Sequence, residues 1–175
     1  DFVNDRIQKF DEDGTYLTQW SYSRPQDIEV DENDDVYVWG DWIMSKFDSS
    51  GAEITSFKRL NYSTYTNPDN RFAVSRTDDL LAVLNIGGII LNTNPMATVT
   101  STPDRYTVVV TTKSAADYVG EFGGMGSGAG EFYRPWIAEF DSTGRLFILD
   151  PDANRIQVFD STTYVEESPV VVSID

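Results

Sequence analysis

Two short acidic segments contain the residue types that bind a hard cation. Asp11–Gly14 and Asp31–Asp35 are rich in carboxylates, whose oxygens are the ligands that Ca²⁺ prefers. An EF-hand loop also needs a glutamate at its twelfth position, and neither segment keeps that register. Aspartate, asparagine and glycine are equally the residues that tight turns require. The sequence therefore predicts a hairpin turn at each place and leaves Ca²⁺ binding open, with the metal ligands unknown.

The composition excludes several kinds of catalysis. The 175 residues include no histidine and no cysteine. Zinc–thiolate sites, cysteine nucleophiles and imidazole acid–base catalysis are therefore excluded. We predict no catalytic residues and no zinc, haem or nucleotide cofactor.

A glycine-rich stretch at Gly120–Gly130 has the composition of a phosphate-binding loop. It lacks the Lys-Ser or Lys-Thr ending of such a loop, and no helical pattern follows it. It stands instead just before Arg134 and Pro135, where one repeat unit gives way to the next. We interpret it as a connector between units.

The charge balance excludes two classes of partner. The chain has 13 Lys plus Arg against 29 Asp plus Glu, a formal net charge of -16 at pH 7. Such a field repels nucleic acid and anionic membrane surfaces. No apolar run reaches the roughly 18 residues that a membrane span needs. The acidity favours a salty or extracellular medium, and a glycosylation sequon at Asn61 agrees with secretion.

One motif occurs twice without a gap. Asp1–Asp11 aligns on Asp150–Asp160, and both segments read D-x4-R-I-Q-x-F-D. Arg6 and Arg155 therefore recur in phase with the aspartate that opens each segment. We predict that this Arg–Asp pair is a brace within or between repeat units.

A second recurring element lies upstream of this motif. A proline is followed six positions later by an aspartate at Pro25, at Pro135 and at Pro169, and an alternating apolar run follows the first two. Period-2 alternation predicts four short strands in each unit and no helix longer than two turns. The first strands, Gln26–Val30 and Trp136–Phe140, are expected to be innermost. The predicted units cover residues 1–20, 25–58, 68–123 with an insertion at 85–104, 135–167, and a partial unit at 169–175.

The combined pattern resembles the NHL repeat. It consists of P-x5-D, an alternating strand, the N-R-I-Q-x-F-D segment and a glycine-rich link to the next proline; the match is strongest at residues 130–167 and weakest at 68–123. The resemblance implies an all-β fold, a β-propeller of four-stranded antiparallel blades. Since there is material for about four blades, we expect an incomplete or open ring.

The resemblance also narrows the function. NHL-like propellers include lyases and lactonases that use metal-bound histidines or acidic residues, and this chain has no histidine. Its RNA-binding members use a basic face, which a charge of -16 opposes. We expect a non-enzymatic binding or scaffolding module, extracellular or on a cell surface, that contacts protein or glycan through strand edges and loops. The alternative is a Ca²⁺-dependent hydrolase or lyase with a carboxylate-lined channel.

Two further expectations concern surfaces. Trp39, Trp42 and Trp136 lie near strand ends, where they either fill space between blades or stack on a sugar; we favour filling. Val170–Ile174 is expected to open a new unit, and Ile7–Trp20 to supply the third and fourth strands of one. Unpaired strand edges recruit other chains. We therefore predict that Val170–Ile174 is covered on both sides, either by a neighbouring chain in a homo-oligomer or filament or, for a fragment, by the rest of its own propeller.

Overall fold

The chain forms two compact units, Asp1–Arg59 and Leu60–Asp175, and each is described by itself. The structure, a computed structural model, describes residues 1–40, 43–57, 72–86, 106–115, 117–160 and 170–173. The strands are β1 (Arg6–Phe10), β2 (Tyr16–Ser21), β3 (Pro25–Val30), β4 (Val36–Gly40), β5 (Ile43–Phe47), β6 (Glu53–Phe57), β7 (Phe72–Val74), β8 (Leu80–Ile86), β9 (Tyr106–Thr112), β10 (Tyr118–Gly123), β11 (Ile137–Phe140), β12 (Leu146–Asp150), β13 (Arg155–Phe159) and β14 (Val170–Ser173).

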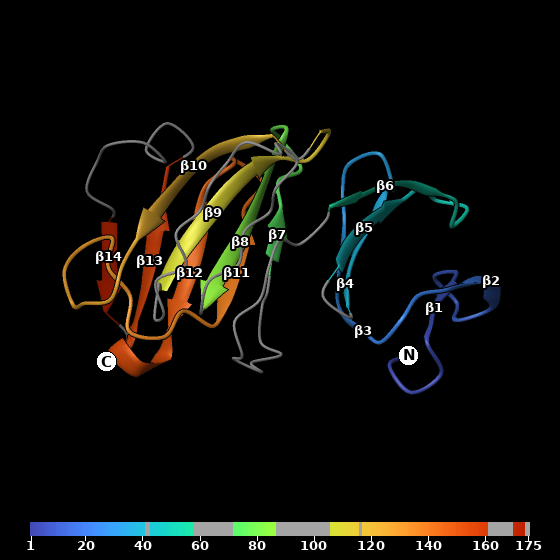
Figure 1. Ribbon diagram of the computed structural model, residues 1–175, viewed down its shortest axis with the longest axis horizontal. Coiled ribbons are helices and arrows are strands. Elements are labelled where there is room, and N and C mark those ends of the chain that lie inside the picture. Colours follow the sequence, from blue (N-terminus) through green and yellow to red (C-terminus); the bar gives the residue numbers. More distant parts are fainter. Residues whose placement is uncertain (41–42, 58–71, 87–105, 116, 161–169, 174–175) are drawn as a thin grey trace. The chain divides into compact units, whose positions relative to one another are not determined.

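The strands form antiparallel sheets that follow the order of the chain (Figure 1). Three sheets have four strands, in the orders β3-β4-β5-β6, β7-β8-β9-β10 and β11-β12-β13-β14, and β1 and β2 form a two-stranded sheet. The all-β prediction is confirmed. Within the described ranges the only helical segment is a 3-10 turn at Pro151–Ala153. No helix in that part of the chain is long and apolar enough to cross a membrane.

Aspartate side chains shape the hairpin turns. Oδ1 of Asp11 accepts hydrogen bonds from the backbone N–H groups of Asp13 (3.1 Å) and Thr15 (2.7 Å), and Oδ1 of Asp31 accepts from Asn33 (2.9 Å) and Asp35 (3.1 Å). The turn prediction is confirmed at both places. The fourth residue of each such turn has a positive φ, which glycine adopts without strain. These residues are Gly14 (81°), Asp34 (62°), Gly51 (90°) and Gly144 (82°).

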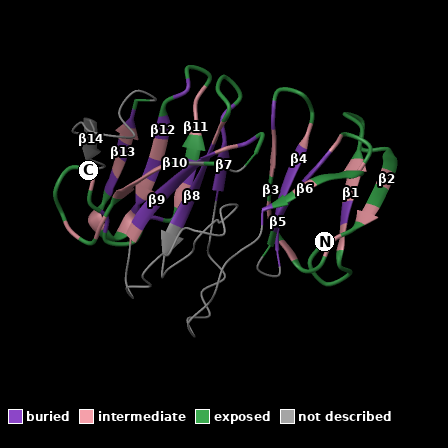
Figure 2. Cartoon of the chain, turned by 45° about the horizontal axis from the view of Figure 1, so that its top comes forward, coloured by how far each residue is buried: buried purple, intermediate pink, exposed green. Residues whose placement is uncertain are grey.

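The core of the second unit lies between its two four-stranded sheets. Figure 2 shows β8 and β9 buried along most of their described length, which agrees with the apolar residues Leu80–Leu84 and Val108–Val110 that they contain. Phe132, from the connector before β11, is fully buried in the same core. The core residues are Ala73, Ala82, Leu84, Val108, Val110, Phe132, Ala138, Leu146, Ile148 and Phe159.

The first unit has a smaller core. Ile7 of β1 packs with Val36 and Val38 of β4 and with Phe47 of β5. Trp20, Tyr22 and Val30 pack around this cluster. One face of the β1–β2 sheet is therefore buried inside the unit, while Figure 2 shows β2 largely exposed.

The assignment of Val170–Ile174 as the first strand of a further unit is wrong. β14 pairs antiparallel with β13, with Ile156 opposite Val172 and Val158 opposite Val170. It is therefore the fourth strand of the sheet that begins at β11. The Pro169–Asp175 spacing imitates a first strand, but a run of valines carries no register of its own and pairs with the edge that β13 offers. β14 is paired along one edge, and cover along the other edge stays a prediction.

Two other predicted segments can be compared with the strands. β8 and β9 remain paired through Asn85–Thr107 and Ile86–Tyr106, so the strand extends two residues into the predicted insertion at 85–104. Gly120–Gly123 belongs to β10, and the connector proper follows it. The innermost position of the first strands stays a prediction. The rest of the insertion, together with Asn61 and Trp42, lies outside the described residues.

Candidate functional site

Three side chains of the repeated motif form hydrogen bonds with the connector between β10 and β11, residues 124–136. Asp150 ends β12, and Arg155 and Gln157 are alternate residues of β13, so the last two share a face. Asp150 accepts hydrogen bonds from the backbone N–H groups of Tyr133 (2.9 Å) and Arg134 (2.8 Å). We call Asp150, Arg155 and Gln157 the filled clamp.

The other two side chains also bind main-chain atoms of the connector. Arg155 donates from Nη1 to the carbonyl of Ser127 (2.7 Å) and from Nη2 to the carbonyl of Glu131 (2.5 Å). Gln157 donates to the same Glu131 carbonyl (2.7 Å) and accepts from the N–H of Gly130 (2.8 Å). The clamp therefore recognises the path of a backbone and not its side chains.

The connector contains glycine where side chains would collide. A Cβ on Gly126 would lie 2.0 Å from the Glu131 carboxylate, and one on Gly123 would lie 2.9 Å from Phe132. Gly123 also has a φ of 107°, which other residues rarely adopt. These glycines thus allow close packing against Glu131 and Phe132. Residues 124–130 lie between β10 and β11, as predicted, whereas Gly120–Gly123 belongs to β10.

The filled clamp is buried. The Asp150 side chain is fully buried and that of Arg155 is 9% exposed, with 3.8 Å between Oδ2 and Nη2. The predicted Arg–Asp brace is present, but both partners act mainly on the connector and only secondarily on each other. Gln157, also fully buried, is a third member that the sequence analysis left out.

The same three residue types recur in the first unit as Asp1, Arg6 and Gln8, which we call the open clamp. Arg6 donates from Nε to Asp1 Oδ2 (3.0 Å) and from Nη1 to Gln19 Oε1 (3.1 Å). The side chains of Arg6 and Asp1 are 35% and 28% exposed. In β1 the position of Phe159 is occupied by Phe10, which is 50% exposed against 2% for Phe159. The residues that pack on the second copy precede it in the chain, whereas the sequence begins with the first copy at Asp1.

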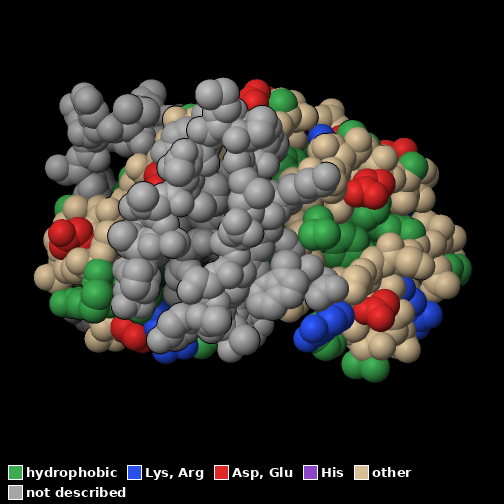
Figure 3. All heavy atoms as spheres, in the orientation of Figure 1, with side chains coloured by type: hydrophobic (Ala, Val, Ile, Leu, Met, Phe, Trp, Pro, Cys, Tyr) green, Lys and Arg blue, Asp and Glu red, His purple; other side chains and the backbone are tan. Residues whose placement is uncertain are grey.

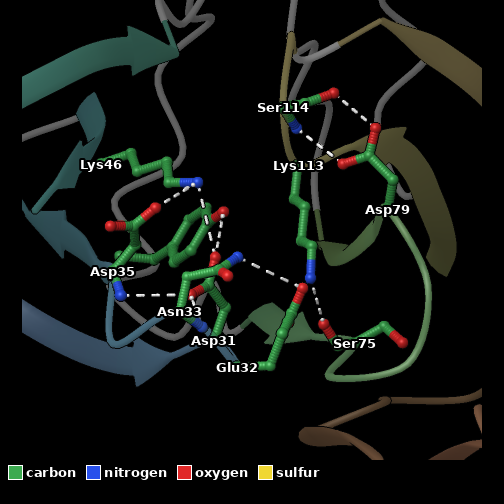
Figure 4. A network of polar contacts seen from close by, with 10 residues as sticks. Asp31, Glu32, Asn33, Asp35, Lys46, Ser75, Asp79, Lys113 and Ser114 are labelled. Carbon is green, nitrogen blue, oxygen red and sulfur yellow. Dashed lines mark hydrogen bonds and ion pairs between the residues drawn. The ribbon is translucent and has the colours of Figure 1, made fainter.

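A buried ionic network lies at the turn between β3 and β4 (Figure 4). Lys46 Nζ lies 2.8 Å from Asp35 Oδ2 and 3.4 Å from Asp31 Oδ2. The Tyr37 hydroxyl donates to Asp31 Oδ2 (3.2 Å), and the ammonium lies 5.0 Å from the centre of the Tyr37 ring. This lysine therefore ties β5 to the turn.

The pKa shifts within the network favour the charged forms of Asp31 and Lys46. Burial alone raises the pKa of Asp31, but hydrogen bonds from the N–H groups of Asn33 and Asp35 and the Lys46 charge outweigh it, so the pKa lies below its ordinary value of 3.8. Burial lowers the pKa of Lys46, and its contacts with Asp35 and Tyr37 raise it well above 10.5 overall. Burial raises the pKa of Tyr37. Both ions are therefore held in their charged forms.

In the second unit, Lys113 and Ser114 contact the turn between β7 and β8. Lys113 donates to the carbonyl of Ser75 (2.9 Å), at the start of the turn between β7 and β8. Ser114 donates its N–H to Asp79 Oδ1 (2.9 Å) and its hydroxyl to Asp79 Oδ2 (Figure 4). A lysine directly after the third strand, β9, thus contacts the first turn of this sheet.

The described residues include no group of three or more Asp or Glu side chains placed to hold a metal ion. In the two acidic segments where Ca²⁺ binding was left open, Asp11 Oδ1 and Asp31 Oδ1 already accept backbone hydrogen bonds. Trp39 is buried in β4, whereas Trp136 is 39% exposed and lies under Arg134, 5.4 Å from its guanidinium carbon. Ca²⁺ binding and the hydrolase or lyase alternative stay untested predictions.

Comparisons with known proteins give local and fold-level likeness. No family model matches the chain. The E3 ubiquitin-protein ligase TRIM71 of Rattus norvegicus is 41% identical over 56 residues, which are 29% of this chain and 6% of that protein. Protein lin-41 of Caenorhabditis elegans is 49% identical over 39 residues, 22% of this chain and 3% of that protein. The matched part is thus a small fraction of either relative's length.

Among solved structures, dihydro-heme d1 dehydrogenase NirN, in complex with DHE, superposes on 99% of this chain and 34% of its own, with a TM-score of 0.64 and 11% identity. At that identity the likeness concerns the fold alone. The four-stranded antiparallel sheets are blades of the β-propeller type, and the two local matches are consistent with the NHL-type repeat.

Proposed function

We propose that this chain is a non-enzymatic protein-interaction module whose binding surface includes the exposed face of the β1–β2 sheet. One observation carries the proposal: Phe10 of β1 and Tyr16 of β2 are each 50% exposed and form an aromatic pair on this sheet.

The surroundings of Phe10 suit a protein partner. Tyr16 lies opposite Phe10 in the sheet, with the two rings edge to face at 6.0 Å. Leu17 and Val3 are also exposed, and Figure 3 shows hydrophobic side chains on the surface of the first unit. Exposed aromatic side chains are enriched at the centres of protein interfaces.

The proposed setting is extracellular or on a cell surface. It is supported by the charge of -16, which keeps a module soluble in salty media, and by the sequon at Asn61. The acidic field favours a partner with a basic rim around an apolar centre. Glycan contacts are a further part of the proposal and rest only on the exposed Trp136.

Site-specific photo-crosslinking tests this function. A photoreactive phenylalanine analogue at Tyr16, in the full chain, is expected to capture a discrete protein from an extract of the cells that make it. The same analogue at Ile54, which is 53% exposed on β6, is the matched control and is expected to capture little. Phe10→Asp should abolish the Tyr16 product. Equal capture from both positions, or none from Tyr16, would overturn the proposal.

A further inference from the structure

An arginine, an aspartate and an aromatic ring come together twice in the β11–β14 sheet and its flanking turns. In the first group, which we call the Phe147 set, the guanidinium carbon of Arg145 lies 5.4 Å from the centre of the Phe147 ring. Arg145 Nε and Nη2 lie 2.8 and 2.6 Å from Asp141 Oδ2. Oδ1 of Asp141 accepts three more hydrogen bonds, from the N–H and hydroxyl groups of Thr143 and from the N–H of Arg145. The Phe147 set therefore satisfies its own polar groups.

The second group, which we call the Trp136 set, has the same chemistry but does not. The guanidinium carbon of Arg134 lies 5.4 Å from the centre of the Trp136 ring, and its Nη1 is 4.0 Å from Asp152 Oδ2, beyond hydrogen-bond reach. The side chains of Arg134 and Asp152 are 47% and 52% exposed, and Trp136 is 39% exposed. Neither charged side chain donates or accepts a hydrogen bond within the described part of the chain.

The backbone that carries the Trp136 set is held by hydrogen bonds. The N–H of Arg134 donates to the buried Asp150 carboxylate at 2.8 Å. The N–H of Trp136 donates to the carbonyl of Leu149, also at 2.8 Å. Asp152 belongs to the 3-10 turn that follows Asp150 directly. A ligand therefore meets side chains on a fixed backbone, which lowers the ordering cost of binding.

An exposed indole beside an unsatisfied guanidinium and carboxylate suits a neutral sugar. The C–H face of a pyranose ring packs on the indole, while its hydroxyls accept from the guanidinium and donate to the carboxylate. An apolar side chain of a protein partner would also cover Trp136, but it would bury Arg134 and Asp152 without hydrogen-bond partners, which is costly. The net charge of -16 repels acidic sugars and phosphates.

We propose that Arg134, Trp136 and Asp152 bind a neutral pyranose unit of a glycan, one whose hydroxyls are equatorial so that a flat C–H face is presented. Trp136 stacks on that face, Arg134 donates to ring hydroxyls, and Asp152 accepts from them. The inference rests on the glycan part of the proposed function and names its site and the class of sugar. It involves no residue of the β1–β2 surface.

Cellotriose and tri-N-acetylchitotriose, both chains of such rings, are the probes, titrated into the isotope-labelled full chain and followed by NMR. At least one is expected to shift, saturably, one of the four indole N–H signals, the one that Trp136→Phe removes. Trp136→Ala, Arg134→Ala and Asp152→Ala should each weaken binding about tenfold or more, because stacking or hydrogen bonds to a charged group are lost. Arg145→Ala, from the Phe147 set, is the matched control and should leave binding unchanged.

Salt and sugar charge test the neutrality of the ligand. The affinity for a neutral probe should stay within about twofold between low and high salt, because no net charge on the sugar is screened. Trigalacturonate, an acidic chain, should bind more weakly than the neutral probes.

The inference is overturned by failure of both neutral probes to bind, by tighter binding of trigalacturonate, or by binding that Trp136→Ala leaves unchanged. A crosslinked product at Tyr16 without sugar binding would leave the protein-interaction function standing and remove only this inference. Sugar binding without a product at Tyr16 would remove the β1–β2 surface and support the Trp136 set.

Discussion

Asp150→Ala is expected to lower the free energy of unfolding by about 3 kcal/mol or more. The substitution leaves the N–H groups of Tyr133 and Arg134 without their acceptor and removes the carboxylate beside buried Arg155. Breaking one partner of a buried ionic contact typically costs 3–5 kcal/mol. Urea denaturation followed by tryptophan fluorescence measures the change.

The chain provides a matched control for this variant. Asp1→Ala removes the same residue type from the same motif, but at the open clamp, where the carboxylate is partly exposed and pairs only with local groups. We expect a loss of about 0.5 kcal/mol or less. Similar losses for the two variants would contradict the distinction between a filled and an open clamp.

Lys46→Met is expected to destabilise the first unit by about 3 kcal/mol. The methionine fills a similar volume, but it leaves the fully buried Asp31 carboxylate without its cation. Lys9→Met is the control, because Lys9 is more exposed and donates to a single carbonyl, that of Ser49. A loss no larger for Lys46→Met than for Lys9→Met would show that the network adds nothing to stability.

The difference in stability between wild type and Lys46→Met should depend on pH at both extremes. The folded-state pKa of Asp31 lies below 3.8, so its contribution is present above that value and is lost as the pH falls further. The folded-state pKa of Lys46 lies above 10.5, so its contribution is present below that value and is lost as the pH rises further. A difference that stays constant from about pH 2 to pH 12 would contradict the ionic account.

The sequence predicted the strands and turns because both depend on local chemistry. Asp11 and Gly14, for example, define a turn within four residues, and alternation marks Leu146–Leu149 as a strand. Val170–Ser173 was misassigned because its place depends on a distant partner, β13. Local patterns identify extended segments but not which edge they join.

The functional residues were predicted less completely. The arginine and aspartate of the motif were identified, while Gln8 and Gln157 were not, although both recur in phase and that recurrence was the available signal. Lys46 was missed because its partners come from a turn at least eleven residues away. The residue pattern of β5 does not indicate that Lys46 is buried.

The first four-stranded sheet shows how the motif diverges. By strand pairing, Gly40 and Ile43 take the places of Asp150 and Arg155. A Cβ on Gly40 would lie only 2.5 Å from the carbonyl oxygen of Arg24, so the chain before β3 passes where a clamp aspartate would stand. In this sheet the aspartate and arginine of the motif are therefore absent, and Gly40 leaves room for the chain before β3.

Hydrogen exchange of the full chain, alone and bound to the protein captured through Tyr16, tests the central claim most directly. The two copies of the motif serve as probe and internal reference in one experiment. We predict that binding slows exchange in Arg6–Phe10 and Tyr16–Ser21 and leaves Arg155–Phe159 unchanged, because its partner is already bound. Protection confined to Glu53–Phe57 or to the second unit, with β1 and β2 unaffected, would contradict the assignment of the exposed motif as the binding surface.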